Sequence, residues 1–118
     1  MKVYKGVNTP VKSSSWNQIS EHFRDRKPSI HRLVEWIQAS EYAHGLFAIT
    51  SLDTLIIGQS AEFDMWRNVV RIDERDDICT IQFCEFLGST SKRDIDGDRL
   101  IQTFSSLISS LKWFCETS

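Results

Sequence analysis

The acidic stretch at residues 94–98 comes closest in this chain to the spacing of a metal site. Its three aspartates stand at alternate positions, as the first oxygen ligands of a calcium loop do. Such a loop also needs glycine at its sixth position and glutamate at its twelfth, where this chain has Arg99 and Ser105. Aspartates at the start of a helix interact favourably with its dipole, and Asp96 is a suitable N-cap. We therefore predict a helix start here, and no metal ion or cofactor.

Histidine, cysteine and serine show no spacing typical of catalysis. His22, His31 and His44 have no second histidine or cysteine at metal-ligand spacing. Cys79 and Cys84 lie in a predicted strand without cationic neighbours, so we expect small core residues rather than nucleophiles. The chain also lacks a nucleophile elbow and a glycine-rich phosphate loop. We predict no catalytic residue.

Four carboxylates stand within five residues, at Asp73, Glu74, Asp76 and Asp77. Catalytic carboxylates need environments that separate their pKa values, which a solvated turn does not provide. Two interpretations remain open. The cluster is either the soluble tip of a hairpin or an acidic knob that binds a basic protein partner.

Two arginines are the best candidates for a ligand site. Arg67 and Arg71 are four residues apart in a predicted strand at residues 67–72, so they share one face of it. Paired guanidinium groups bind anions well. A small enzyme or an anion-binding domain that uses these arginines is therefore the alternative to a protein-binding function.

The segment at residues 100–111 contains no charged residue. As a helix over residues 100–114 it has an apolar stripe, and the opposite face presents Gln102, Ser106, Ser109 and Trp113. A solvated helix face normally carries lysine and glutamate. We therefore predict that this helix is covered on both sides, by its own domain or by another chain, with Trp113 as an anchor.

The elements that position these residues follow from periodicity and breakers. We predict helices over residues 15–26 and 29–42, strands at residues 46–50, 54–57, 67–72 and 78–86, a loop at 88–94, and the final helix. Strands joined by short turns form an antiparallel meander. The prediction is a single α+β domain over residues 1–118 in two layers, with order α-α-β-β-β-β-α and with residues 1–13 extended or loosely ordered.

Composition limits the possible partners. The net charge of −2 divides into +4 over residues 1–38 and −6 over residues 39–118. A pI near 5.9 argues against nucleic acid, although Arg24, Arg26, Lys27 and Arg32 cluster near one helix junction. No apolar run is long enough for a membrane span or a signal peptide. Three cysteines in such a chain indicate reduced thiols, so we expect a cytoplasmic protein.

These features together predict a small non-catalytic module that binds protein. Its surfaces would be the Trp113 face of the last helix and the acidic hairpin tip. Its size and acidity would suit an inhibitor or immunity partner of a basic toxin. The same helix face would equally suit a two-fold homodimer.

Overall fold

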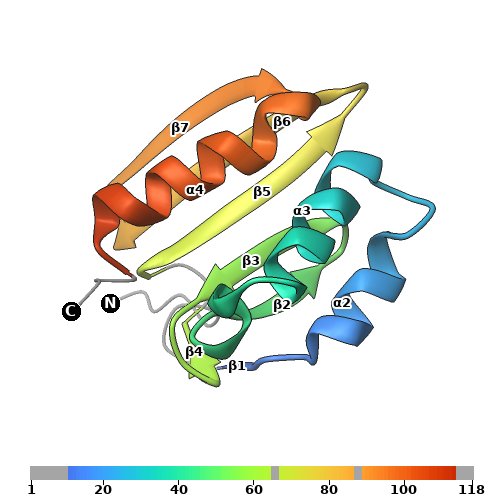
Figure 1. Ribbon diagram of the computed structural model, residues 1–118. Coiled ribbons are helices and arrows are strands. Elements are labelled where there is room, and N and C mark those ends of the chain that lie inside the picture. The colour runs from blue at the N-terminus through green and yellow to red at the C-terminus, as the bar shows by residue number, and fades with distance from the viewer. Residues whose placement is uncertain (1–10, 65–66, 87–88, 114–118) are drawn as a thin grey trace, which may run out of the picture.

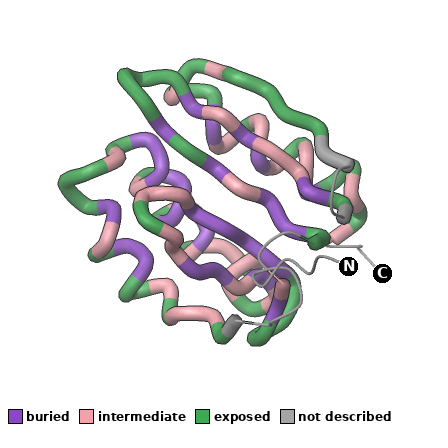
Figure 2. The backbone as a smooth tube through the Cα atoms, turned by 180° about the vertical axis from the view of Figure 1, so that it is seen from behind, coloured by how far each residue is buried: buried purple, intermediate pink, exposed green. Residues whose placement is uncertain are grey.

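The computed structural model describes residues 11–64, 67–86 and 89–113, and Figure 1 shows their arrangement. The predicted α+β class is confirmed: three helices lie on one face of an antiparallel sheet, while Figure 2 shows the opposite face without helices. The helices are α2 (Trp16–Phe23), α3 (Pro28–Gln38) and α4 (Leu100–Leu111), with short 3-10 helices η1 (Glu41–His44) and η2 (Gly97–Arg99). Within the described ranges, no helix has the length and apolarity needed to cross a bilayer.

The main sheet has the strand order β2-β3-β5-β6-β7. Its strands are β2 (Phe47–Ser51), β3 (Thr54–Gly58), β5 (Val69–Arg75), β6 (Ile78–Phe86) and β7 (Ser89–Asp96). Each strand is antiparallel to its neighbours, so the predicted meander is confirmed. At the β5–β6 turn Asp76 and Asp77 both have positive φ, 53° and 69°, which is typical of a type I′ hairpin.

The fifth strand, β7, was not predicted. We expected a loop at residues 88–94 and a sheet of four strands, but β7 pairs with β6 along its whole length. Among the described side chains of β7, Ile95 is the hydrophobic one that packs against the main core. A polar strand at the edge of a sheet shows little apolar alternation, which is why periodicity did not detect it.

The N-terminal helices begin largely as expected. Ser15 and Gln18 form the predicted capping box of α2. α3 begins one residue earlier than predicted, with Pro28 at its first position, and its N-cap Lys27 makes no side-chain capping bond. Ser29 is therefore not the cap of α3.

The core lies between the helices and the sheet. Its buried residues come from all three helices and from the helix-facing side of the strands, for example Phe23, Leu33, Ile57, Ile72 and Phe104. A second buried cluster occupies one half of the opposite face.

In this second cluster Ile49, Ile56 and Val69 lie beneath Phe63 of β4 (Glu62–Phe63), which pairs with β1 (Val11–Lys12). A Cβ atom on Gly58 would lie 2.8 Å from the Phe63 ring, so glycine lets β4 approach the sheet closely.

Residues 1–10 of the segment predicted as extended or loose lie outside the described residues, and Val11–Lys12 is a strand.

The last helix ends earlier than predicted, and its predicted N-cap instead precedes a separate 3-10 helix. Asp96 is the N-cap of η2, without a side-chain capping bond, and α4 begins only at Leu100. α4 ends at Leu111 because Lys112 adopts the left-handed conformation with φ 60°. Trp113 thus lies beyond the helix, and its backbone N–H donates to the carbonyl of Ile108.

Candidate functional site

Glu74 is not part of an exposed acidic tip. Its side chain faces the helices and the residue is only 6% exposed. The Glu74 carboxylate accepts hydrogen bonds from the backbone N–H groups of Ser29 and Ile30, at 2.9 and 3.1 Å. These donors are unpaired at the start of any helix, and Glu74 supplies the cap that Lys27 lacks. The prediction that Glu74 belongs to an interface is therefore corrected: it anchors β5 to α3.

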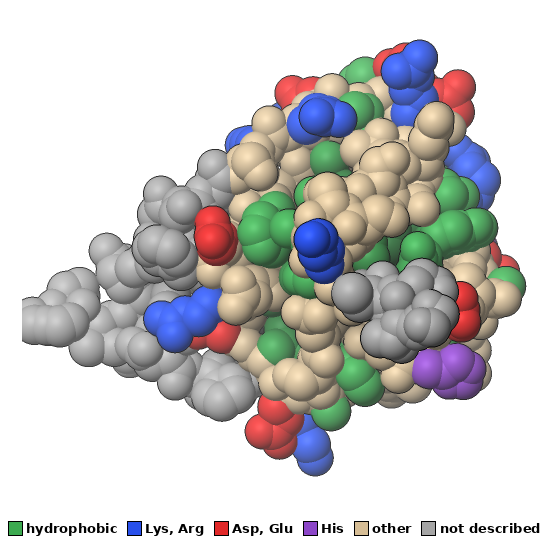
Figure 3. Space-filling model, turned by 60° about the vertical axis from the view of Figure 1, so that its left-hand side comes forward, with side chains coloured by type: hydrophobic (Ala, Val, Ile, Leu, Met, Phe, Trp, Pro, Cys, Tyr) green, Lys and Arg blue, Asp and Glu red, His purple; other side chains and the backbone are tan. Residues whose placement is uncertain are grey.

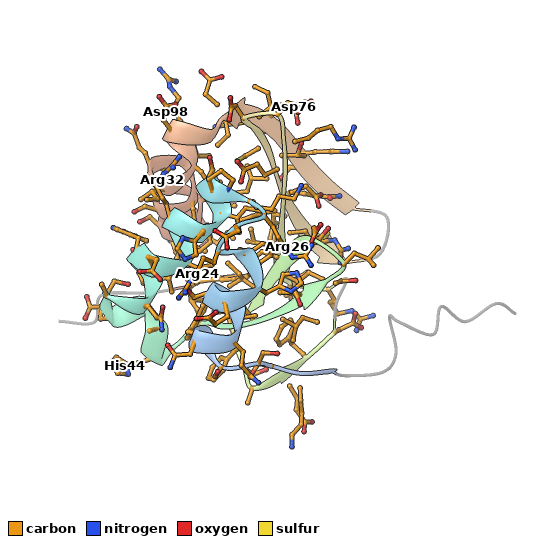
Figure 4. The ribbon with its side chains drawn as sticks, turned by 90° about the vertical axis from the view of Figure 1, so that its right-hand side faces the viewer. Arg24, Arg26, Arg32, His44, Asp76 and Asp98 are labelled. Carbon is orange, nitrogen blue, oxygen red and sulfur yellow. The ribbon has the colours of Figure 1, made fainter. Side chains whose placement is uncertain are left out.

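The other three acids of this cluster are exposed. Asp73 points to the open face of the sheet and accepts a hydrogen bond from the Thr54 hydroxyl. Asp76 and Asp77 form the β5–β6 turn, where the Asp77 carbonyl accepts from the N–H of Gly97 at 2.8 Å. Figure 4 shows Asp76 and Asp98 near one end of the molecule and His44 near the other. Three of the four predicted carboxylates thus remain available at the surface.

The two candidate anion-binding arginines do not lie on one face of the same strand, as the sequence had predicted. β5 begins at Val69, so Arg67 lies in the preceding bend, where it is exposed. Arg71 lies on the open face, with Ile56 and Gln82 as its cross-strand neighbours. Burial lowers the pKa of Arg71, and the nearby Asp73 carboxylate partly offsets this. Neither arginine lines the two hollows described below.

A serine, a histidine and a glutamate meet between α2 and α3, which the sequence analysis did not identify. The Ser20 hydroxyl donates to Glu35 at 2.8 Å and lies 3.2 Å from Nε2 of His31. The same Nε2 atom is 3.5 Å from Glu35. In a catalytic triad the acid and the nucleophile contact different ring nitrogens. Ser20 is also only 5% exposed, so this cluster joins two helices rather than forming a site.

The other histidines and the cysteines have structural surroundings. His22 contacts the Leu52 carbonyl at 3.0 Å and Asp53 at 3.3 Å, which ties α2 to the β2–β3 turn. Cys79 and Cys84 are free thiols in the core, as expected. Burial raises the pKa of both, that of Cys79 to about 11 with a further contribution from the nearby Glu74 carboxylate. Among the described residues, no group of three or more potential metal ligands occurs.

The basic residues near the α2–α3 junction are engaged locally. Arg24 and Arg26 form ion pairs with carboxylates, at 2.7 and 3.6 Å. Lys27 donates to the main-chain carbonyl of Glu74 at 2.8 Å, and Arg32 donates to the Ser29 hydroxyl at 3.2 Å. Their positive charge therefore serves contacts within the fold.

The uncharged side of α4 is exposed within this chain. Gln102, Ser106, Ser109 and Ser110 are exposed, while Leu100, Phe104 and Ile108 face the sheet. Figure 3 brings the C-terminal end of α4 forward and shows a mostly uncharged surface there. No described part of the chain covers this side.

Trp113 does not share this surface. Its ring packs edge-on against Phe83, with the ring centroids 6.1 Å apart and the planes at 74°. It also contacts the main core and is only partly exposed. The left-handed Lys112 turns the chain back towards the sheet, so the prediction of Trp113 as an anchor on the serine face is corrected.

A groove of about 320 Å³ runs between α4 and the edge strand β7. Its floor is formed by Ile81 and Phe83. The α4 wall consists of Thr103, Ser106, Leu107 and Ser110, and the β7 wall consists of Ser91, Lys92 and Arg93. Gln102 and Ser109, although exposed, do not line it. Within the described chain, Lys92 and Arg93 form no ion pair, and β7 has no strand partner besides β6.

A broader hollow of about 730 Å³ lies on the open face of the sheet, near the β2–β3 and β5–β6 turns. Five acidic residues are in its lining, and two of them accept a hydrogen bond from a threonine hydroxyl: Asp73 from Thr54, and Asp94 from Thr80 at 2.7 Å. Lys27, Arg75 and Lys92 are also in its lining, so the hollow has mixed charge and no single ligand class matches it.

The geometry therefore offers one extended surface with both an unpaired backbone and an uncharged helix, the α4–β7 side. The surface combines the uncharged side of α4, which the sequence indicated, with the edge strand β7, which it did not. No family model, curated protein or solved structure matches this chain, so its relatives supply no function.

Proposed function

We propose that the protein is a non-catalytic association module that self-associates through its α4–β7 surface. This surface consists of the exposed side of α4, including Ser106 and Ser110, and the edge strand β7 with Lys92 and Arg93. The observation that carries the proposal is that the uncharged side of α4 adjoins an edge strand without a second neighbour in the described chain.

The chemistry of α4 favours burial against protein. Covering a lysine or glutamate requires removing a full charge from water, whereas a hydroxyl group needs one hydrogen-bond partner. Ser110 already has one, because its hydroxyl donates to the Leu107 carbonyl of its own helix at 3.0 Å. Small serine side chains also allow a neighbouring backbone to come close. Association would therefore hide this face at little desolvation cost.

The edge strand adds backbone hydrogen bonds. An edge strand presents unpaired N–H and C=O groups that a second strand can satisfy. β7 spans Ser89–Asp96 and is among the longer strands of this sheet, so it offers a long template. Burying the partly exposed Phe83 of the groove floor would add apolar contact beside it.

The alternative, an enzyme or anion-binding domain, has less support. Ser20 is buried, and the two arginines Arg67 and Arg71 line no described hollow. The buried free thiols Cys79 and Cys84 suit a reducing compartment, and we place the module in the cytoplasm as part of the same proposal.

Sedimentation equilibrium tests the proposal. The expected species has twice the chain mass of 13.7 kDa. Ser106→Arg should shift it to the monomer, because association would bury the new positive charge in a groove that Lys92 and Arg93 already line. Gln59→Arg adds the same charge to the exposed loop after β3 and serves as the control, which should remain dimeric. A wild-type protein that stays monomeric at every concentration reached would overturn the proposal.

A further inference from the structure

We infer that two copies of this chain pair β7 with β7, antiparallel, about a two-fold axis at Arg93. Lys92 of each copy then faces Asp94 of the other, and the five-stranded sheets join into one continuous sheet. This inference rests on the proposed function and names the partner and its register.

Strand geometry restricts the possible registers. A two-fold axis perpendicular to the sheet keeps the helices of both copies on one side. Directly opposed side chains of an antiparallel pair lie on the same face of the sheet. The axis must therefore pass midway between one residue and the same residue of the other copy. The central candidates in β7 are Lys92, Arg93 and Asp94.

Charge and length select among these candidates. An axis at Lys92 places the two Lys92 side chains directly opposite and forms no ion pair. An axis at Asp94 also forms two contacts of unlike charge, Lys92–Asp96, but it pairs only residues 92–96 and places two Asp94 carboxylates opposite each other. An axis at Arg93 pairs residues 90–96 and creates two Lys92–Asp94 contacts on the open face. Directly opposite charges of unlike sign stabilise a strand pair, and like charges destabilise it.

The register about Arg93 places the two Arg93 side chains opposite each other. This like-charge contact is easier to accommodate than one between two Asp94 side chains. Asp94 is short and its carboxylate is held by the Thr80 hydroxyl at 2.7 Å, so two opposed aspartates could not move apart. Arg93 is long and lines the groove between β7 and α4, where Thr103 and Ser106 supply hydroxyl groups. Its guanidinium group can extend into each groove, away from the axis.

The charges on β7 also explain why the edge does not pair indiscriminately. Lysine on an edge strand discourages unselective pairing. Lys92 and Asp94 lie two residues apart on one face, so their pattern is complementary to itself only in the antiparallel direction. The same charges would therefore repel most foreign strands and select a second copy.

Charge exchange tests this register. Lys92→Glu and Asp94→Lys should each weaken the dimer about tenfold or more, because each turns two attractive contacts into repulsive ones. A mixture of the two variants should form a heterodimer, since Glu replaces Lys92 in one copy and Lys replaces Asp94 in the other. Both positions are exposed, and circular dichroism checks that each variant folds.

Cysteine cross-linking gives a second readout in a Cys115→Ser background. Arg93→Cys should form a disulfide dimer under mild oxidation, since position 93 faces itself, whereas Lys92→Cys should not. If the wild type is monomeric, the proposed function fails. If the wild type is dimeric but Asp94→Lys stays dimeric and Arg93→Cys does not cross-link, only this register is refuted.

Discussion

Replacing Glu74 should reveal how strongly β5 and α3 depend on each other. The Glu74 carboxylate is buried and accepts hydrogen bonds from two backbone N–H groups at the start of α3, at 2.9 and 3.1 Å. In Glu74→Ala both donors lose their acceptor and stay in the interior, because Ser29 and Ile30 are themselves buried. No other side chain caps this helix.

The size of the effect follows from these contacts. A buried donor without an acceptor costs about 1–3 kcal/mol, and hydrogen bonds to a charged group are among the stronger ones. Two such donors, partly rehydrated, should lower the free energy of unfolding by about 3–4 kcal/mol. Glu74→Gln keeps one oxygen acceptor but loses the charge at the helix N-terminus, so about 1–2 kcal/mol is expected.

Urea denaturation followed by circular dichroism measures both variants. Asp76→Asn is the matched control, because it removes a carboxylate from the same hairpin at an exposed position with positive φ that asparagine tolerates. Its stability should stay close to that of the wild type. The capping role would be refuted if Glu74→Ala cost no more than Asp76→Asn.

Two further predictions concern the same end of the molecule. Gly97→Ala would place a Cβ atom against the Ser29 hydroxyl oxygen, so the free energy of unfolding measured in urea should fall by about 1–3 kcal/mol. Adding Ser29→Ala should recover part of this loss. An unchanged urea midpoint in Gly97→Ala would contradict this close packing. Because burial raises the pKa of Cys79 to about 11 from 9.0, the folded protein holds this proton more tightly. Stability should therefore fall as pH rises from about 9 towards 11, less steeply in Cys79→Ala; identical slopes would disprove the assignment.

The sequence predicted those elements whose apolar side chains repeat with the period of their secondary structure. α2 was found from its capping box and its apolar spacing, and β3 from its run of apolar residues. β7 has almost no apolar residue, because one side of it is open and the other borders a groove. Only the pairing with β6 shows it to be a strand.

Long-range contacts explain the two corrected site residues. Glu74 is separated by 45 positions from Ser29, and nothing in the acidic run distinguishes it from its exposed neighbours. An alternation count along β5 would have placed Glu74 on the same side as Val70 and Ile72, which is the one signal that could have identified it. Trp113 was misplaced because one left-handed residue, Lys112, ends the helical period.

The uncharged serine side of α4 was predictable from helical periodicity and the absence of charge, whereas its exposure within this chain was not. Its association with β7 was not, because the register between the last strand and the last helix depends on how η2 turns the chain. The sequence thus indicated an unusual helix face but not the neighbouring edge strand that completes the surface.

Hydrogen exchange at β7 tests whether this edge strand is where two copies meet. The backbone N–H groups of Ser89–Asp96 that point away from β6 have no acceptor in the described chain, and they should become protected as the protein concentration rises through the dimerisation range. Exchange of these amides at the same fast rate in dilute and concentrated protein would contradict it.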